Sequence, residues 1–239
     1  MTSLASTTST VSSGVCRLVI LVSGRGSNMQ AIVRAIESRG LAAQVVAVVS
    51  DKPAAAGLDW ARQQGLETCA LEPGAYVNRE AYDQALAHAV QAYSPDYVLL
   101  AGFMRILSDG FVNRFAGRLV NIHPSLLPSF PGLKTHENAL KTGVQWHGCT
   151  VHFVTPELDS GPIIGQAAVP VLATDTPQSL AERVLVVEHR LYADVVEWLA
   201  DGRVSLQDDG RVAVTDLSTR ACVLASDDAT AAAVTLIKA

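Results

Sequence analysis

The stretch Asn121-Ile122-His123-Pro124-Ser125-Leu126-Leu127-Pro128 decides how this chain of 239 residues is organised. The apolar pair Leu119-Val120 leads into it and predicts that the octad begins on a buried β-strand. Proline has no N–H and a fixed φ, so the prolines of the octad, with Pro131 beyond them, take the chain out of the sheet into an ordered loop. Asn121 and His123 are two residues apart and therefore point to the same face of the strand. The sequence thus directs an amide and an imidazole together from a strand end, which is where open α/β sheets bind ligands.

A glycine-rich loop stands near the start of the chain. Residues 17–22 predict a strand, Ser23-Gly24-Arg25-Gly26-Ser27-Asn28 follows, and apolar residues then recur at helical spacing. Ser27 and Gln30 have the spacing of a capping box. A strand, a glycine loop and a helix start direct free N–H groups toward an anion. The loop lacks the Gly-Lys-Ser/Thr of Walker A, and Met29 stands where a dinucleotide fingerprint has its third glycine. A single phosphate monoester is therefore favoured, with a plain tight turn as the alternative.

Strand and helix patterns alternate along the first half of the chain. This alternation predicts an α/β fold: a Rossmann-like open, mostly parallel twisted sheet with helices on both faces. The later strands are expected to form an antiparallel part and a C-terminal hairpin. The predicted strands are 17–22, 43–50, 67–71, 97–101, 148–154 and 163–171, with 204–206 and 212–214 in the hairpin.

Composition excludes several classes of function. The formal charge is −5 and no cluster of lysines and arginines is present, which argues against a nucleic-acid partner. The longest apolar runs, such as 18–22 and 98–101, are too short to cross a bilayer, so no membrane partner is expected. The four cysteines are scattered and form no CxxC pair, which is typical of a reduced, cytoplasmic compartment.

Three further acidic or metal-type patterns have two interpretations each. Glu188 falls within the apolar stripe of the last long helix, so it is either a buried ion-pair partner or a ligand-binding carboxylate. Asp159 precedes Ser-Gly in a turn, where it either forms the turn or partners His123. His147, Cys149 and His152 form H-x-C-x-x-H, but on a strand His152 faces away from the other two, which disfavours a zinc site.

The octad, followed by Pro131-Gly132, resembles the signature loop of folate-dependent formyltransferases, and the resemblance extends over about residues 16–215. It implies transfer of a formyl group from 10-formyltetrahydrofolate to the amine of 5′-phosphoribosylglycinamide, without metal. The chain would then divide into a disordered tail at 1–15, a formyltransferase domain at 16–217 and a peripheral tail at 218–239. Within the domain, 16–117 would be the phosphate-binding half and 118–217 the formylfolate and catalytic half. A monomer or homodimer is expected.

The resemblance also assigns residues. Asn121 and His123 would stabilise the oxyanion of the tetrahedral intermediate, and Asp159 would favour protonated His123 and organise a water. The ribonucleotide-binding residues implied are Gly26, Ser27, Asn28 and Glu188. The formylfolate-binding residues implied are Arg79, Met104, Arg105, Ile106, Leu107, Asn121, Thr155 and Asp159.

Rival functions share the central loop. Formyltetrahydrofolate hydrolases usually carry an N-terminal regulatory domain, and methionyl-tRNA formyltransferases a C-terminal β-barrel; the chain predicts neither. From another class, a folate- or nucleotide-binding module without catalysis would take up ligand without turnover.

Overall fold

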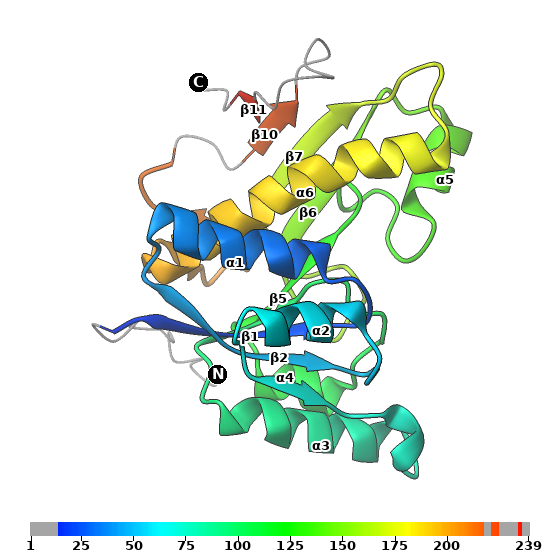
Figure 1. The fold of residues 1–239 in the computed structure, drawn as a ribbon. Coiled ribbons are helices and arrows are strands. Elements are labelled where there is room, and N and C mark those ends of the chain that lie inside the picture. Colours follow the sequence, from blue (N-terminus) through cyan, green and yellow to red (C-terminus); the bar gives the residue numbers. More distant parts are fainter. Residues whose placement is uncertain (1–13, 218–220, 225–233, 236–239) are drawn as a thin grey trace, which may run out of the picture.

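One sheet of nine strands runs through the computed structural model, which describes residues 14–217, 221–224 and 234–235 (Figure 1). Its strands are β1 (Cys16–Val22), β2 (Ala43–Ser50), β3 (Thr68–Ala70), β4 (Tyr97–Leu100), β5 (Leu119–His123), β6 (Trp146–Phe153), β7 (Ile163–Pro170), β10 (Ala221–Leu224) and β11 (Val234–Thr235). Their order is β11-β10-β7-β6-β5-β4-β1-β2-β3. From β3 to β5 neighbouring strands are parallel, and β6 is antiparallel to both β5 and β7. A separate hairpin joins β8 (Val204–Leu206) to β9 (Val212–Val214).

Helices cover both faces of this sheet (Figure 1). One face carries α1 (Ser27–Arg39), α2 (Ala56–Gln63), α5 (Thr135–Thr142) and α6 (Pro177–Ala200). The other carries α3 (Arg79–Ala92) and α4 (Asp109–Arg114), with the short 3₁₀ helix η1 (Pro73–Ala75) before α3. The predicted fold class, including the antiparallel late strands and the terminal hairpin, is confirmed.

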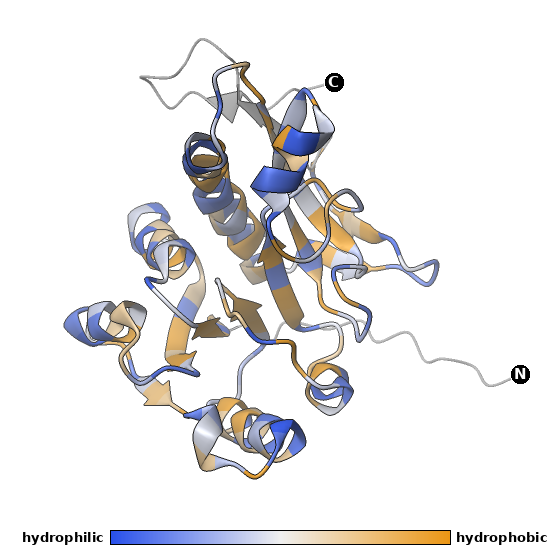
Figure 2. Cartoon of the chain, turned by 90° about the vertical axis from the view of Figure 1, so that its right-hand side faces the viewer, coloured by the Kyte–Doolittle hydropathy of each residue, from blue (hydrophilic) through white to orange (hydrophobic). Residues whose placement is uncertain are grey.

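The period-two pattern of β1 explains the two-sided core. Leu18, Ile20 and Val22 pack on the side of α1 and α6, whereas Val19 and Leu21 pack on the side of α3 and α4. All five are fully buried. In Figure 2 the apolar colour accordingly gathers on the central strands, while the hydrophilic colour marks the outer surfaces of the helices.

The same alternation decides which way the central octad faces. Val120 and Ile122 of β5 belong to the core under α6, so Asn121 and His123 point to the opposite face of the sheet. In β6, Val151 also packs under α6, which places its neighbour His152 with Asn121. The predicted common face of Asn121 and His123 is therefore confirmed.

Both predicted tails fall largely outside the described residues. Of the tail at 1–15, residues 1–13 are not described. Of the tail at 218–239, the structure describes only β10 and β11, which extend the sheet: β10 pairs in parallel with β7, and β11 pairs antiparallel with β10.

Candidate active site

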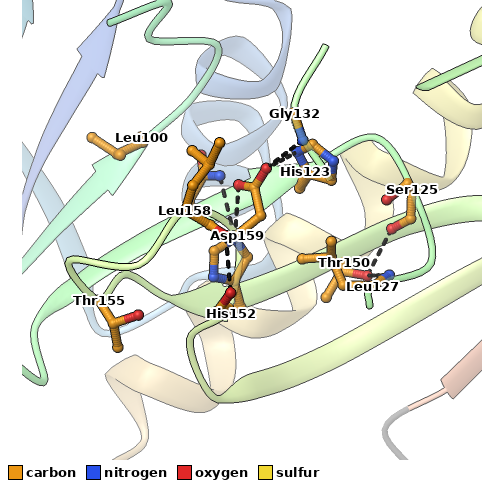
Figure 3. A network of polar contacts seen from close by, with 12 residues as sticks. Leu100, His123, Ser125, Leu127, Gly132, Thr150, His152, Thr155, Leu158 and Asp159 are labelled. Carbon is orange, nitrogen blue, oxygen red and sulfur yellow. Dashed lines mark hydrogen bonds and ion pairs between the residues drawn. The ribbon is translucent and has the colours of Figure 1, made fainter. Parts of the chain in front are cut away.

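Three segments bring their polar side chains together beyond the end of β5 (Figure 3). The Nδ1 atom of His123 lies 3.5 Å from Oδ2 of Asp159, although 36 residues separate the two in sequence. Both side chains are buried, with 7% and 8% of their surface exposed. Oδ1 of Asp159 lies 4.0 Å from Nε2 of His152, on β6. The carboxylate of Asp159 therefore sits between two imidazoles, one from each strand.

The backbone decides which nitrogen of His123 can react. Its Nε2 lies 3.0 Å from the carbonyl oxygen of Phe130. A carbonyl only accepts, so Nε2 carries a hydrogen and donates it. Nδ1 is left facing the carboxylate of Asp159. The atom of His123 that can exchange a proton with a ligand is consequently Nδ1, beside the carboxylate.

His152 orients the amide of Asn121. The Nδ1 atom of His152 lies 2.8 Å from the carbonyl oxygen of Phe153 and must donate to it. Burial lowers the pKa of His152, so the ring is neutral and its Nε2 is an acceptor. Nδ2 of Asn121 lies 3.3 Å from that acceptor. One N–H of the Asn121 amide is thereby used, and the second remains for a ligand.

Asp159 is held by its own backbone and by the loop after β5. Its φ is +51°, a left-handed conformation that a short polar residue in a turn tolerates. Its Oδ2 accepts a 2.8 Å hydrogen bond from the backbone N–H of Gly132. The residue thus serves both interpretations given to it by the sequence: it forms the turn, and it partners His123.

The glycine loop lies at the start of α1. Gly26 is the N-cap, with φ 67°, and no side chain caps the helix. The predicted capping box of Ser27 and Gln30 is therefore wrong: the left-handed Gly26 makes Ser27 the first helical residue, and Gln30 Nε2 donates instead to the Arg25 carbonyl at 3.1 Å. The first N–H groups of α1 have no partner inside the helix, and a helix start of this kind favours an anion.

Asn28 and Glu188 connect this helix start to α6. Nδ2 of Asn28 donates to Oε2 of Glu188 at 2.8 Å, between residues 160 positions apart. Burial raises the pKa of Glu188, and the Asn28 hydrogen bond opposes that shift. Oδ1 of Asn28 is buried and has no hydrogen-bond partner among the described residues. A buried acceptor without a partner is the mark of a site that a ligand donor completes.

The segment after β4 lies beside the glycine loop. The backbone N–H of Met104 donates to Oγ of Ser23 at 2.9 Å, and the N–H of Ser23 donates to the Gly102 carbonyl at 3.1 Å. These bonds join the loops after β1 and β4, at the point where the strand order reverses. Met104 and Ile106 are 69% and 65% exposed, so two apolar side chains flank exposed backbone there. A flat heterocycle needs that combination.

The remaining predicted folate residues divide into two groups. Arg79 Nη2 donates to the Leu107 carbonyl at 2.7 Å, and this hydrogen bond joins Arg79 of α3 to the segment that follows β4. Arg105 stacks its guanidinium over the ring of Tyr82, with 4.7 Å from Cζ to the centroid. Thr155, by contrast, donates within its own loop, to the Glu157 carbonyl at 3.3 Å, and Figure 3 places it apart from the Asp159 cluster.

His152 is the site residue that the sequence left without a role. Its position opposite Asn121 follows from the β5–β6 register, which no motif reports. The odd spacing from Cys149 does predict its face, because Cys149 packs in the core under α6 while His152 lies with Asn121. His147 instead lies 3.2 Å from His136 of α5, measured from Nε2 to Nδ1. Within the described part of the chain, no three histidine, cysteine or acidic side chains gather as a metal group.

Comparisons with known proteins agree on one family. The formyl transferase family model matches residues 16–196. The chain is 52% identical to the phosphoribosylglycinamide formyltransferase of Escherichia coli K12 over 192 residues, 80% of this chain and 91% of that protein. The glycinamide ribonucleotide transformylase 1 structure from Symbiobacterium toebii superposes with a TM-score of 0.82 at 44% identity, covering 86% of this chain and 96% of that one. A formyltetrahydrofolate deformylase from Pseudomonas syringae reaches 0.79 at 27% identity, covering 85% of this chain and 67% of that one.

Proposed function

The chain belongs to the formyl transferase family, and from that premise we propose that it transfers the formyl group of 10-formyltetrahydrofolate to the amine of 5′-phosphoribosylglycinamide. The products are formylglycinamide ribonucleotide and tetrahydrofolate. The protein is a folate-dependent formyltransferase of purine biosynthesis, and its substrates are small molecules. No helix within the described residues is long and apolar enough to span a membrane. We propose a cytoplasmic location and a monomer or homodimer.

The observation that carries the proposal is the convergence of Asn121, His123 and Asp159 from separate segments. Formyl transfer begins when the substrate amine attacks the formyl carbon and negative charge develops on the formyl oxygen. The free N–H of Asn121 and a protonated Nδ1 of His123 are donors on one face of β5 that can stabilise this charge. The neutral state of His152 keeps the Asn121 amide aimed as a donor.

Proton transfer completes the reaction. The attacking amine loses a proton through a water held by the carboxylate of Asp159, and the folate N10 gains one from His123 as the bond between carbon and N10 breaks. The Asp159 charge then favours reprotonation of His123. The reaction needs no covalent intermediate with the enzyme.

The two substrates fit opposite parts of the site. The phosphate of the ribonucleotide would lie on the N–H groups at Gly26, Ser27 and Asn28, and Glu188 with the free Asn28 Oδ1 would bind its polar portion. The pterin would lie against Met104 and Ile106, with Arg105 and Leu107 supporting that segment. Arg79 and Thr155 would contact the rest of the folate.

A single assay tests the function against its nearest rival. Deformylation by hydrolysis is the second candidate, because the deformylase shares the fold at 27% identity. Purified protein would be mixed with 10-formyltetrahydrofolate and followed by folate absorbance with glycinamide ribonucleotide, with no acceptor, or with aminoacylated initiator tRNA. Turnover only with the ribonucleotide is expected. Equal turnover without acceptor would identify a hydrolase instead, and binding without turnover in all three would contradict catalysis.

A further inference from the structure

A second polar network, centred on Thr150, lies beside the catalytic groups on the same face of the sheet (Figure 3). Thr150 is fully buried and pairs with His123 of β5 on one side and Gln166 of β7 on the other. Its hydroxyl donates to the Ser125 carbonyl at 2.7 Å and accepts from the Leu127 N–H at 3.0 Å and from Gln166 Nε2 at 3.1 Å. A hydroxyl has one donor and two acceptor sites, so its capacity is completely used.

Gln166 holds the same loop from the next strand. Its Nε2 also donates to the Leu127 carbonyl at 2.9 Å. Both backbone groups of Leu127 are therefore bound by side chains of the sheet, one by Thr150 and one by Gln166. Leu127 therefore cannot move relative to β6 and β7 without breaking buried hydrogen bonds. Each buried polar group left without a partner lowers the free energy of unfolding.

The loop that these two side chains hold is the loop that orients His123. The Ser125 N–H donates to the His123 carbonyl at 2.9 Å, and Ser125 Oγ donates to the Ser129 carbonyl at 2.7 Å. The next residue, Phe130, supplies the carbonyl that accepts from His123 Nε2. A continuous set of hydrogen bonds thus runs from Thr150 through the loop to the far side of the imidazole ring.

We propose that Thr150 and Gln166 are positioning residues for formyl transfer, because they latch the loop of residues 124–130 and thereby keep the Phe130 carbonyl on His123. The proposal deepens the proposed function and rests on its assignment of His123 as the proton donor. A merely structural role would cost stability alone. A positioning role lowers kcat, because a displacement of about 1 Å at a reacting group can reduce the rate by about 100-fold.

The kinetic test compares matched variants. Thr150→Val keeps the shape but removes the hydroxyl, Thr150→Ser keeps the hydroxyl, and Gln166→Met removes the amide at similar length. We expect Thr150→Val and Gln166→Met to lower kcat toward that roughly 100-fold limit, with little change in either KM, and Thr150→Ser to restore it.

Tyr192→Phe is the control for lost stability. It removes another fully buried hydroxyl, whose single O–H is shared between the carbonyls of Leu100 at 3.3 Å and Val120 at 3.1 Å, on the opposite face of β5 from Asn121 and His123. It should lower the thermal midpoint and leave kcat unchanged. If Thr150→Val behaves like this control, with wild-type kcat, the latch has no positioning role and the proposal is overturned.

Amide hydrogen exchange provides a readout that does not depend on turnover. Thr150→Val should speed exchange at Leu127 and Ser129, whereas Tyr192→Phe should not. If the wild-type protein shows no turnover, the proposed function fails, and unchanged exchange at Leu127 in Thr150→Val would then reject the latch as well. Gln166→Met leaves Thr150 in place and keeps both tests decisive if Thr150→Val does not fold.

Discussion

The two ends of the proposed active site differ in whether the protein itself supplies the hydrogen-bond partners of their polar groups. At the catalytic end the protein itself makes the orienting hydrogen bonds: Phe130 binds His123, His152 binds Asn121, and Gly132 binds Asp159. At the phosphate end, the start of α1 has no side-chain cap, and the buried Oδ1 of Asn28 has no partner among the described residues. One end is oriented by hydrogen bonds within the protein, and in the proposed function the ribonucleotide would supply the partners missing at the other.

This difference predicts how substitutions at the two ends divide between kcat and KM. Groups that are already oriented contribute to the transition state, so their loss should lower kcat. Groups that wait for a ligand contribute to ground-state binding, so their loss should raise KM for the ribonucleotide. Each substitution below tests whether the catalytic residues affect kcat and the ribonucleotide-binding residues affect KM.

The largest effect is expected for His123→Ala. It removes both the oxyanion donor and the acid that protonates the leaving N10, and a positioned acid alone contributes about 10²–10⁴-fold. kcat should fall by at least that factor, nearly abolishing turnover, with KM for the ribonucleotide little changed. Steady-state kinetics would measure it, with circular dichroism to show that the variant folds. Wild-type turnover in a folded variant would remove His123 from the mechanism.

Asn121→Ala should have the next largest effect. It removes one of two oxyanion donors, a loss of about 2.7–4 kcal/mol in transition-state stabilisation, or about 10²–10³ in kcat. His152→Gln offers a comparison, because it removes the acceptor that orients Asn121 but leaves the donor present, and should cost less. Rates measured at saturating substrate would check both. A rise in KM with unchanged kcat for Asn121→Ala would break the proposed division between the two ends.

Glu188→Gln tests the phosphate end. The amide can still accept from Asn28, but the charge that would hold a polar group of the ribonucleotide is lost; hydrogen bonds to charged groups contribute about 1.5–3 kcal/mol. KM for the ribonucleotide should rise by roughly 10-fold or more while kcat and the folate KM stay near wild type. Glu182→Gln, an exposed glutamate on the same helix, is the control. A loss confined to kcat would place Glu188 at the catalytic end.

A feature of the fold or of the site could be predicted where local sequence determines it, and not where contacts between distant segments determine it. The mostly parallel first half of the sheet and the common face of Asn121 and His123 depend on strand–helix alternation and on local periodicity, which the sequence displays. A left-handed conformation at Gly26 is expected for a glycine. The capping box predicted beside it is wrong, because this conformation makes Gly26 the N-cap and shifts the helix start by one position.

Residues whose roles depend on strand register could not be found in the same way. His152 meets Asn121, and Thr150 meets His123 and Gln166, only because β6 pairs with β5 and β7 in one particular register. A register shift of one residue would reverse each face. The partnership of Asp159 with His123 was available only through family resemblance, since a separation of 36 positions carries no distance information.

The smallest effect expected separates two buried groups, His147 beside α5 and Glu188 of α6, by the sign of their response to acid. Burial, with the nearby charges of His136 and His123, lowers the pKa of His147 to about 4, whereas burial raises the pKa of Glu188. Between pH 6.5 and about 4 the unfolded chain binds a proton at His147 that the folded protein does not, so this contribution to stability is complete above pH 6.5 and is lost as pH falls. Glu188 acts oppositely, because its carboxylate binds a proton at higher pH in the folded protein than in the unfolded chain, so stability is gained as pH falls toward the ordinary pKa of a glutamate.

Urea unfolding at several pH values would measure this difference. His147→Gln should flatten the loss of the free energy of unfolding between pH 6.5 and 4 by at most about 1.4 kcal/mol per pH unit, the limit for one proton. Glu188→Gln should steepen that loss, because it removes the compensating proton uptake of the buried carboxylate. If both variants shifted the pH dependence in the same direction, the opposite pKa shifts of His147 and Glu188 would be contradicted.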